Sequence, residues 1–115
     1  MIPPLRIIFT GYATGDNLKQ LYSNAALFVL PSRNEGFPIV LLEAMAYQLD
    51  VLVSDIPATH LVDLQEKDYV KLDDENSLIK GISDKLQNIT SRKYDLTNFN
   101  WDKIALKVYD IYHNI

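Results

Sequence analysis

Apolar residues along the chain fall into two alternating patterns. Short apolar or β-branched runs are typical of strands, whereas stretches in which apolar residues recur every three to four positions are typical of amphipathic helices. Strands are predicted at 6–10, 26–30, 51–54 and 69–72. Helices are predicted at about 16–25, 38–46, 59–64, 74–86 and 101–113. This alternation favours an α/β domain in which a parallel sheet is flanked by helices.

Single residues predict the ends and faces of these elements. Asp16 and Asp74 each precede a periodic stretch and are predicted to cap its helix. The run 26–30 is apolar throughout, as in a strand that is buried on both faces. Gly81 interrupts the helix after Asp74 and costs about 1 kcal/mol relative to alanine. That helix is expected to pack through one apolar face, made of Leu78, Ile79, Ile82 and Leu86.

Composition and charge exclude several classes of function. The 115 residues fit one domain, and 48% apolar residues suffice for a hydrophobic core. Without cysteine, disulfides and thiolate metal sites are excluded, and the two separated histidines do not suggest a histidine metal site. The net charge of -4 argues against nucleic acid as the main partner. No apolar run approaches the roughly 20 residues that span a bilayer, and the start lacks a signal peptide, so we expect a cytoplasmic protein.

One carboxylate stands out in the predicted helix 38–46. Every residue from 39 to 46 is apolar except Glu43, and a helix that is apolar all round is expected to be buried. A buried carboxylate is costly to desolvate unless other groups hydrogen-bond it. Its partners are either groups of the protein, such as backbone N–H groups or Arg33, or the hydroxyls of a ligand.

The surroundings of this helix favour a ligand. Its N-terminus lies just past the carboxyl end of a predicted strand, where open α/β sheets bind ligands. The free N–H groups at 39–41 form an anion site that suits a phosphate. Gly36 lets a ligand approach the backbone closely, although it also fits a plain turn. Glu35 and Glu43 would then accept hydrogen bonds from hydroxyl groups on either side of the phosphate.

Glu35 and Glu43 have seven residues between them, and Gly36-Phe37 follows the first. This spacing resembles the paired-glutamate motif of retaining glycosyltransferases with the GT-B fold, and most closely their family four. Other segments are similar to the same family in the same order, over nearly the whole chain: 9–12, 21–25, 28–32, 42–46, 53–57 and 100–105. The resemblance implies a Rossmann-like C-terminal half-domain of such an enzyme, spanning 1–115, which binds a nucleotide sugar.

The resemblance also implies a role for individual residues. Glu43 would bind the ribose hydroxyls, and Glu35 would lie beside the donor sugar as the catalytic-site residue. The remaining donor contacts would come from Gly36, Phe37, Pro38, Ile39, Val40 and Leu41, and from the loop Gly11, Tyr12 and Ala13 beside the base. No metal and no cofactor are implied, because the nucleoside diphosphate sugar is itself the donor substrate. The acceptor, a sugar or a lipid-linked sugar, would bind to an N-terminal domain.

The chain departs from the family in several places. An upstream arginine and lysine that neutralise the diphosphate are absent, as is the acceptor domain. Gln48 and Asp50 replace a glycine and a proline after the motif helix, and Lys67 and Asp68 replace turn glycines. We therefore expect a truncated piece that is inactive alone and self-associates through its last helix, about 101–113.

Other interpretations stay open. A sugar-nucleotide 2-epimerase shares the fold, and a short protein that binds a nucleotide sugar without catalysis fits as well. His60 is interpreted as a loop or helix residue rather than a catalytic base. In a full-length enzyme, peripheral attachment to the inner face of the membrane is also expected.

Overall fold

The computed structural model describes residues 7–11, 13–33 and 39–96. The predicted last helix, and with it the predicted surface for self-association, lies outside the described residues. Within the described part, no helix is long and apolar enough to cross a membrane.

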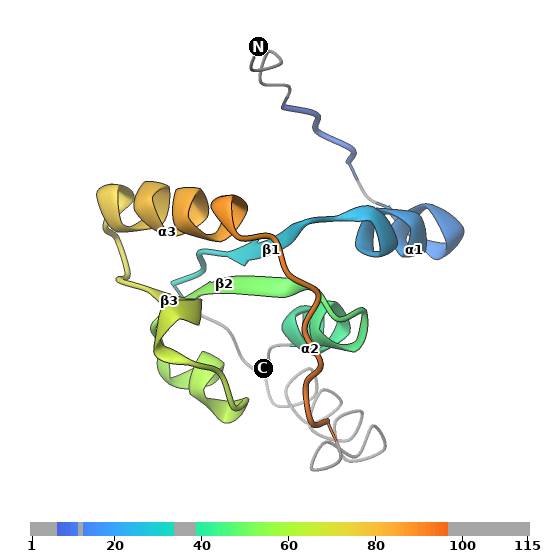
Figure 1. Cartoon of the computed structure of the whole chain (residues 1–115). Coiled ribbons are helices and arrows are strands. Elements are labelled where there is room, and N and C mark those ends of the chain that lie inside the picture. The colour runs from blue at the N-terminus through green and yellow to red at the C-terminus, as the bar shows by residue number, and fades with distance from the viewer. Residues whose placement is uncertain (1–6, 12, 34–38, 97–115) are drawn as a thin grey trace, which may run out of the picture.

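Three parallel strands form the sheet, in the order β1-β2-β3 (Figure 1). They are β1 (Leu27–Leu30), β2 (Asp50–Ser54) and β3 (Tyr69–Val70). The helices α2 (Ile39–Ala46) and α3 (Glu75–Gln87) lie on opposite sides of this sheet. The predicted α/β fold, with a Rossmann-like parallel sheet and flanking helices, is confirmed.

The central strand β2 divides the core between the two sides of the sheet. All five of its residues are buried, because β1 and β3 cover its edges. Val51 and Val53 join the apolar cluster that contains the buried face of α2. Leu52 points the other way, toward Gly81 of α3. The alternation of side chains along a strand explains how one short strand holds both helices.

Three of the predicted strands differ from the structure. Ile7 to Thr10 form no strand, and the side chain of Phe9 is 93% exposed. A strand requires a neighbour that takes up its backbone hydrogen bonds, and no described strand lies beside this segment. β1 is only partly buried, rather than buried on both faces, because it is an edge strand. β3 ends at Val70, two residues before the predicted end.

Two of the predicted helices also differ from the structure in their caps or their type. The helix α1 (Gly15–Asn24) has Thr14 at its N-cap, so the prediction that Asp16 caps it is wrong. Asp16 lies in the first turn, where a negative charge is favourable to the helix dipole. The helix predicted at 59–64 is a 3-10 helix, η1 (Pro57–Leu61), and proline fixes its first φ angle.

The prediction for α3 is half right. The cap is confirmed, since the Asp74 carboxylate accepts a hydrogen bond of 2.9 Å from the Ser77 N–H. The predicted packing face is wrong in part, because Ile79 and Leu86 are exposed by 58% and 46%. Gly81 and Lys85 lie toward the sheet instead. Lys85 is buried because its ammonium group finds two carboxylates there.

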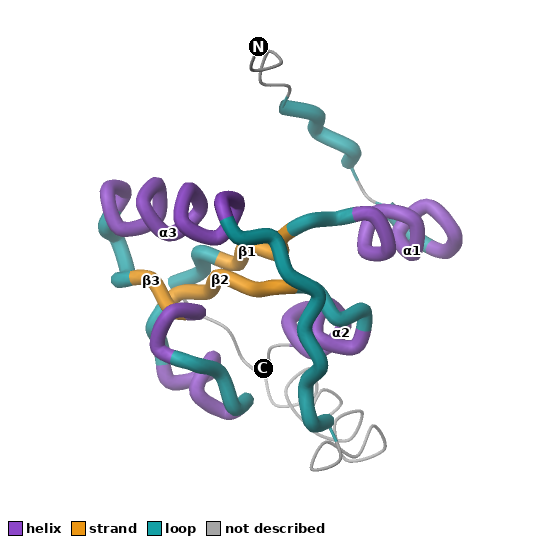
Figure 2. Tube along the Cα trace, viewed as in Figure 1, coloured by secondary structure: helices purple, strands orange, loops and turns teal. Residues whose placement is uncertain are grey.

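After α3 the chain continues as an extended loop that crosses the sheet toward α2 (Figure 2). This segment, residues 88–96, is called the strap here. The Arg92 N–H donates to the Gln48 carbonyl at 3.0 Å, and the Tyr94 hydroxyl donates to the Leu49 carbonyl at 2.6 Å. The strap therefore lies beside the amino-terminal end of β2.

Candidate functional site

The N-terminal end of α2 is the predicted anion site. The first N–H groups of a helix have no acceptor within the helix. Val40 is 41% exposed and Ile39 is partly exposed, whereas Leu41 has no exposed surface. The accessible part of this helix end is therefore formed by Ile39 and Val40, and Leu41 belongs to the core.

Glu43 lies on the outer face of α2 and is only partly buried. Val40 and Tyr47, one turn before and after it, are exposed by 41% and 39%. The expectation of a helix buried all round is therefore wrong, because α2 packs on the sheet with one face only. A carboxylate at this position keeps part of its hydration and remains accessible to a ligand.

The partner of Glu43 is neither of the protein groups anticipated from the sequence. Among the described residues, the Tyr22 hydroxyl of α1 donates to Glu43 Oε2 at 3.4 Å. Arg33 forms an ion pair with Asp73 instead, at 3.0 Å. This contact could not be predicted from the sequence, because a spacing of 21 residues between Tyr22 and Glu43 follows no helical or strand period.

The other predicted site residues are placed apart from Glu43 or lie outside the described residues. Gly11 is exposed with φ +68°, and Ala13 borders a cavity of about 660 Å³ beside α1. No residue of α2 lines that cavity. Neither Gly11 nor Ala13 shares a cavity or a hydrogen bond with Glu43 among the described residues. The remaining predicted residues lie outside the described part: Tyr12, Glu35, Gly36, Phe37 and Pro38.

A polar cavity of about 370 Å³ occupies the carboxyl ends of the strands. Ser54 ends β2, Lys71 follows β3, and the Arg33–Asp73 ion pair lies at its border. Carboxyl ends of parallel strands are where α/β sheets bind ligands. No group of three or more histidine and acidic side chains that suits a metal ion occurs in the described ranges.

His60 lies near the same edge of the sheet. It is part of η1, pairs with the Asp55 carboxylate and stacks on the Tyr69 ring, with 4.4 Å between ring centroids. His60 and Asp55 are both more than half exposed. These contacts give the imidazole a local structural partner.

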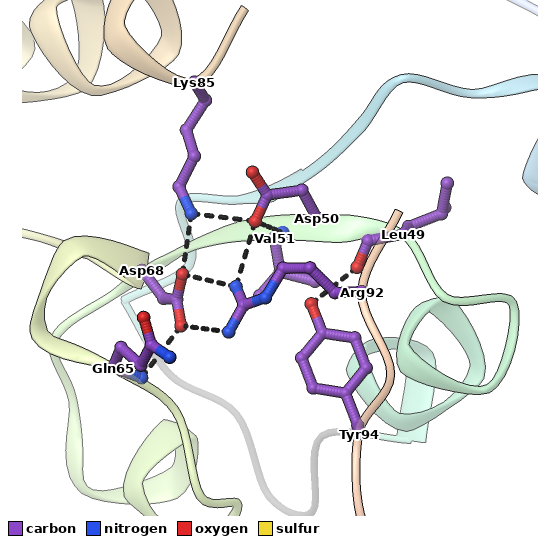
Figure 3. A network of polar contacts seen from close by, with 8 residues as sticks. All are labelled: Leu49, Asp50, Val51, Gln65, Asp68, Lys85, Arg92 and Tyr94. Carbon is purple, nitrogen blue, oxygen red and sulfur yellow. Dashed lines mark hydrogen bonds and ion pairs between the residues drawn. The ribbon is translucent and has the colours of Figure 1, made fainter. Parts of the chain in front are cut away.

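A cluster of four charges lies at the opposite end of β2 (Figure 3). Lys85 Nζ binds Asp50 Oδ1 at 2.8 Å and Asp68 Oδ1 at 2.6 Å. Arg92 Nη1 binds the same two oxygens at 2.9 and 2.6 Å. The group of Asp50, Asp68, Lys85 and Arg92 is called the charge cluster, and it contains two charges of each sign.

Hydrogen bonds outweigh burial in the charge cluster. Burial alone would raise the pKa of Asp68, but hydrogen bonds from Arg92 and Lys85 lower that pKa below its usual value. Burial would lower the pKa of Arg92, but its bonds to Asp68 and Asp50 raise it. Asp68 and Arg92 therefore stay charged near neutral pH. The cluster lies at the amino-terminal end of β2, away from the carboxyl ends of the strands.

Comparison with known proteins identifies the family. Residues 3–88 match the family described as glycosyl transferases group 1. The chain belongs to this family. A glycosyltransferase of Methanocaldococcus jannaschii is 32% identical over 117 residues, which is 93% of this chain and 30% of the relative. The O-antigen chain mannosyltransferase of Salmonella typhimurium is 39% identical over 110 residues, 84% of this chain and 31% of the relative.

A third relative has a named donor and acceptor. The UDP-Gal:alpha-D-GlcNAc-diphosphoundecaprenol alpha-1,3-galactosyltransferase of Escherichia coli is 30% identical over 116 residues, 93% of this chain and 30% of the relative. The chain thus spans about a third of the length of these curated glycosyl transferases. No solved structure matches it significantly.

The structure shows what Gln48, Asp50 and Asp68 do in this chain. Gln48, which is expected to stand where the resembled family has a glycine, adopts the left-handed φ of +62°. Its N–H bonds to the Met45 carbonyl and the Leu49 N–H to the Ala44 carbonyl, which closes the end of α2 as glycine would. Asp50 and Asp68 are the two acids of the charge cluster.

Proposed function

We propose that this chain forms the nucleotide-sugar-binding part of a retaining glycosyltransferase that acts in polysaccharide or glycolipid synthesis. The observation that carries this proposal is the position of Glu43. Its carboxylate is partly exposed on α2, and a single described donor, Tyr22, reaches it through one oxygen. None of the described residues donates to the other oxygen, which would accept hydrogen bonds from a ribose.

The adjacent helix end supplies the second part of the proposed site. A helix N-terminus carries roughly half a positive charge and free N–H groups, which suit the diphosphate of a nucleotide sugar. Glu35, Gly36 and Phe37 would face the sugar, and Gly11 to Ala13 the base. Glu35 would interact with the sugar as its anomeric bond to the diphosphate breaks with retention of configuration.

Binding by this chain alone is expected to be weak. The helix end offers the diphosphate only about half a positive charge, whereas the resembled enzymes add an arginine and a lysine. Each charged hydrogen bond from such a side chain is worth about 1.5–3 kcal/mol. Losing two of them moves the dissociation constant from micromolar toward millimolar. The acceptor would bind to a surface outside these residues, so we expect no sugar transfer by the chain alone. A lipid-linked acceptor would bring a full-length cytoplasmic enzyme to the inner face of the membrane.

The test is the Glu43→Gln substitution. Uridine, guanosine and adenosine diphosphates are titrated into the 115-residue chain and followed by ligand-observed NMR, which detects millimolar binding. Glu43→Gln should weaken the best binder about tenfold or more, because a charged acceptor is lost. The matched control is Glu66→Gln, at an exposed carboxylate of η2 (Glu66–Asp68). Equal affinity in the unaltered chain and Glu43→Gln, with unchanged circular dichroism, would remove the role.

A further inference from the structure

Tyr22 is held in one orientation by aromatic neighbours from two other segments. Its ring stacks on Tyr47 at a centroid distance of 5.3 Å and an interplanar angle of 11°. It also packs against Phe28 of β1 at 6.2 Å. Aromatic pairs with centroids between 4.5 and 7 Å stabilise the structure by more than the burial of their apolar surface alone. These two contacts favour the ring orientation in which the hydroxyl group reaches Glu43.

The hydroxyl of Tyr22 is a donor to the carboxylate. Burial and the neighbouring charge of Glu43 raise the pKa of Tyr22, so the phenol remains protonated at neutral pH. It donates to Oε2 only, at the long end of hydrogen-bonding distance. Among the described residues, none donates to Oε1.

We propose that Tyr22 is a positioning residue, which fixes the rotamer of Glu43 so that Oε1 points outward to the ribose hydroxyls of a nucleoside diphosphate. The inference rests on the proposed function of Glu43. A glutamate side chain has three rotatable bonds, and fixing them before the ligand arrives removes an entropy cost from binding. A tyrosine on the neighbouring helix thus contributes to affinity without touching the ligand.

The chain offers a matched pair of variants. Tyr22→Phe removes the hydroxyl that reaches Glu43 and keeps the ring, whereas Tyr47→Phe removes a hydroxyl from the ring stacked on it. Each variant is titrated with the nucleoside diphosphate that binds the unaltered chain best, and with inorganic pyrophosphate, which lacks the ribose. Urea unfolding of both variants serves as the control that they remain folded.

Tyr22→Phe should weaken nucleoside diphosphate binding about fivefold, as expected for one neutral donor. Its affinity for pyrophosphate should not change, and Tyr47→Phe should bind both probes normally. In the Glu43→Gln background, adding Tyr22→Phe should have little further effect, because the two residues act as one unit.

Three outcomes separate the inference from the proposed function. If Glu43→Gln binds normally, the proposed function itself fails and the inference fails with it. If Glu43→Gln weakens binding but Tyr22→Phe does not, only the role of Tyr22 is overturned. If Tyr22→Phe weakens pyrophosphate equally, the tyrosine acts on the packing of α2 and not on the ribose site, which also overturns the inference.

Discussion

Arg92 and Asp68 form a two-point ion pair in which Nη1 lies 2.6 Å from Oδ1 and Nη2 lies 3.1 Å from Oδ2. Asp68 has no exposed surface, and its Oδ2 also accepts the Gln65 N–H at 2.8 Å. The fork of a guanidinium matches a carboxylate in this way, and a lysine cannot reproduce it. The pair joins the strap to η2 and so determines where the chain runs after α3.

Breaking the ion pair between Arg92 and Asp68 should lower the free energy of unfolding. Arg92→Gln leaves Asp50 and Asp68 buried with only Lys85 to balance them, and removing one partner of a buried pair costs about 3–5 kcal/mol. The midpoint of urea unfolding should fall accordingly. Lys93→Gln, at the exposed neighbouring position, is the control and should change the stability by less than about 0.5 kcal/mol.

A second substitution tests whether charge balance is the cause. Arg92→Gln combined with Asp68→Asn removes one charge of each sign and should recover part of the stability lost in Arg92→Gln alone. If the losses simply add, the two side chains do not interact and the importance given to their ion pair is refuted.

The lowered pKa of Asp68 predicts how stability depends on pH. The usual value is 3.8, and hydrogen bonds from Arg92 and Lys85 outweigh burial and lower it in the folded state. The carboxylate therefore adds stability that is fully present above about pH 4 and is lost as the pH falls through the folded pKa. Urea unfolding between pH 2.5 and 7 should show a weaker acid dependence in Asp68→Asn than in the unaltered chain. Identical slopes below pH 4 would contradict the assignment.

The left-handed conformation of Gln48 predicts a stabilising substitution. A side chain at φ +62° is strained, and glycine adopts this angle freely. Gln48→Gly should raise the free energy of unfolding by about 0.5–1 kcal/mol. Gln20→Gly is the control, since Gln20 lies inside α1, where glycine costs a similar amount. Thermal unfolding that shows a loss in both variants would disprove the strain at Gln48.

At Gly81, replacing the glycine with alanine is expected to lower the stability of the chain. A Cβ atom here would lie 3.0 Å from Leu52 Cδ2 and 3.0 Å from Val70 Cγ1. Overpacking of a core costs about 1–3 kcal/mol, and alanine regains about 1 kcal/mol through its helix propensity. Gly81→Ala should therefore destabilise the chain by about 1 kcal/mol. Ser83→Ala, on the exposed side of α3, should be neutral or slightly stabilising in the same thermal scan.

The alternation of apolar runs and periodic stretches correctly predicted the α/β class, strands β1 and β2, helix α2 and the Asp74 cap. These features are local: a strand or helix leaves a periodic pattern in its own residues, and a cap lies next to the helix that it ends. The motif residues also led to the glycosyltransferase family. The ribose-binding role of Glu43 stays a prediction.

Only the tertiary structure decided which distant residues meet. The charge cluster joins residues up to 42 positions apart, and its acids are those that looked like departures from the family pattern. Tyr22 of α1 reaches Glu43 of α2 although the two residues are 21 positions apart in the sequence. Ile7 to Thr10 form no strand because none of the described strands pairs with them. The sequence by itself determined the local elements and the family, since these depend on neighbours along the chain. Burial, pairing and partner choice depend on neighbours in space, and those exist only after the elements have packed.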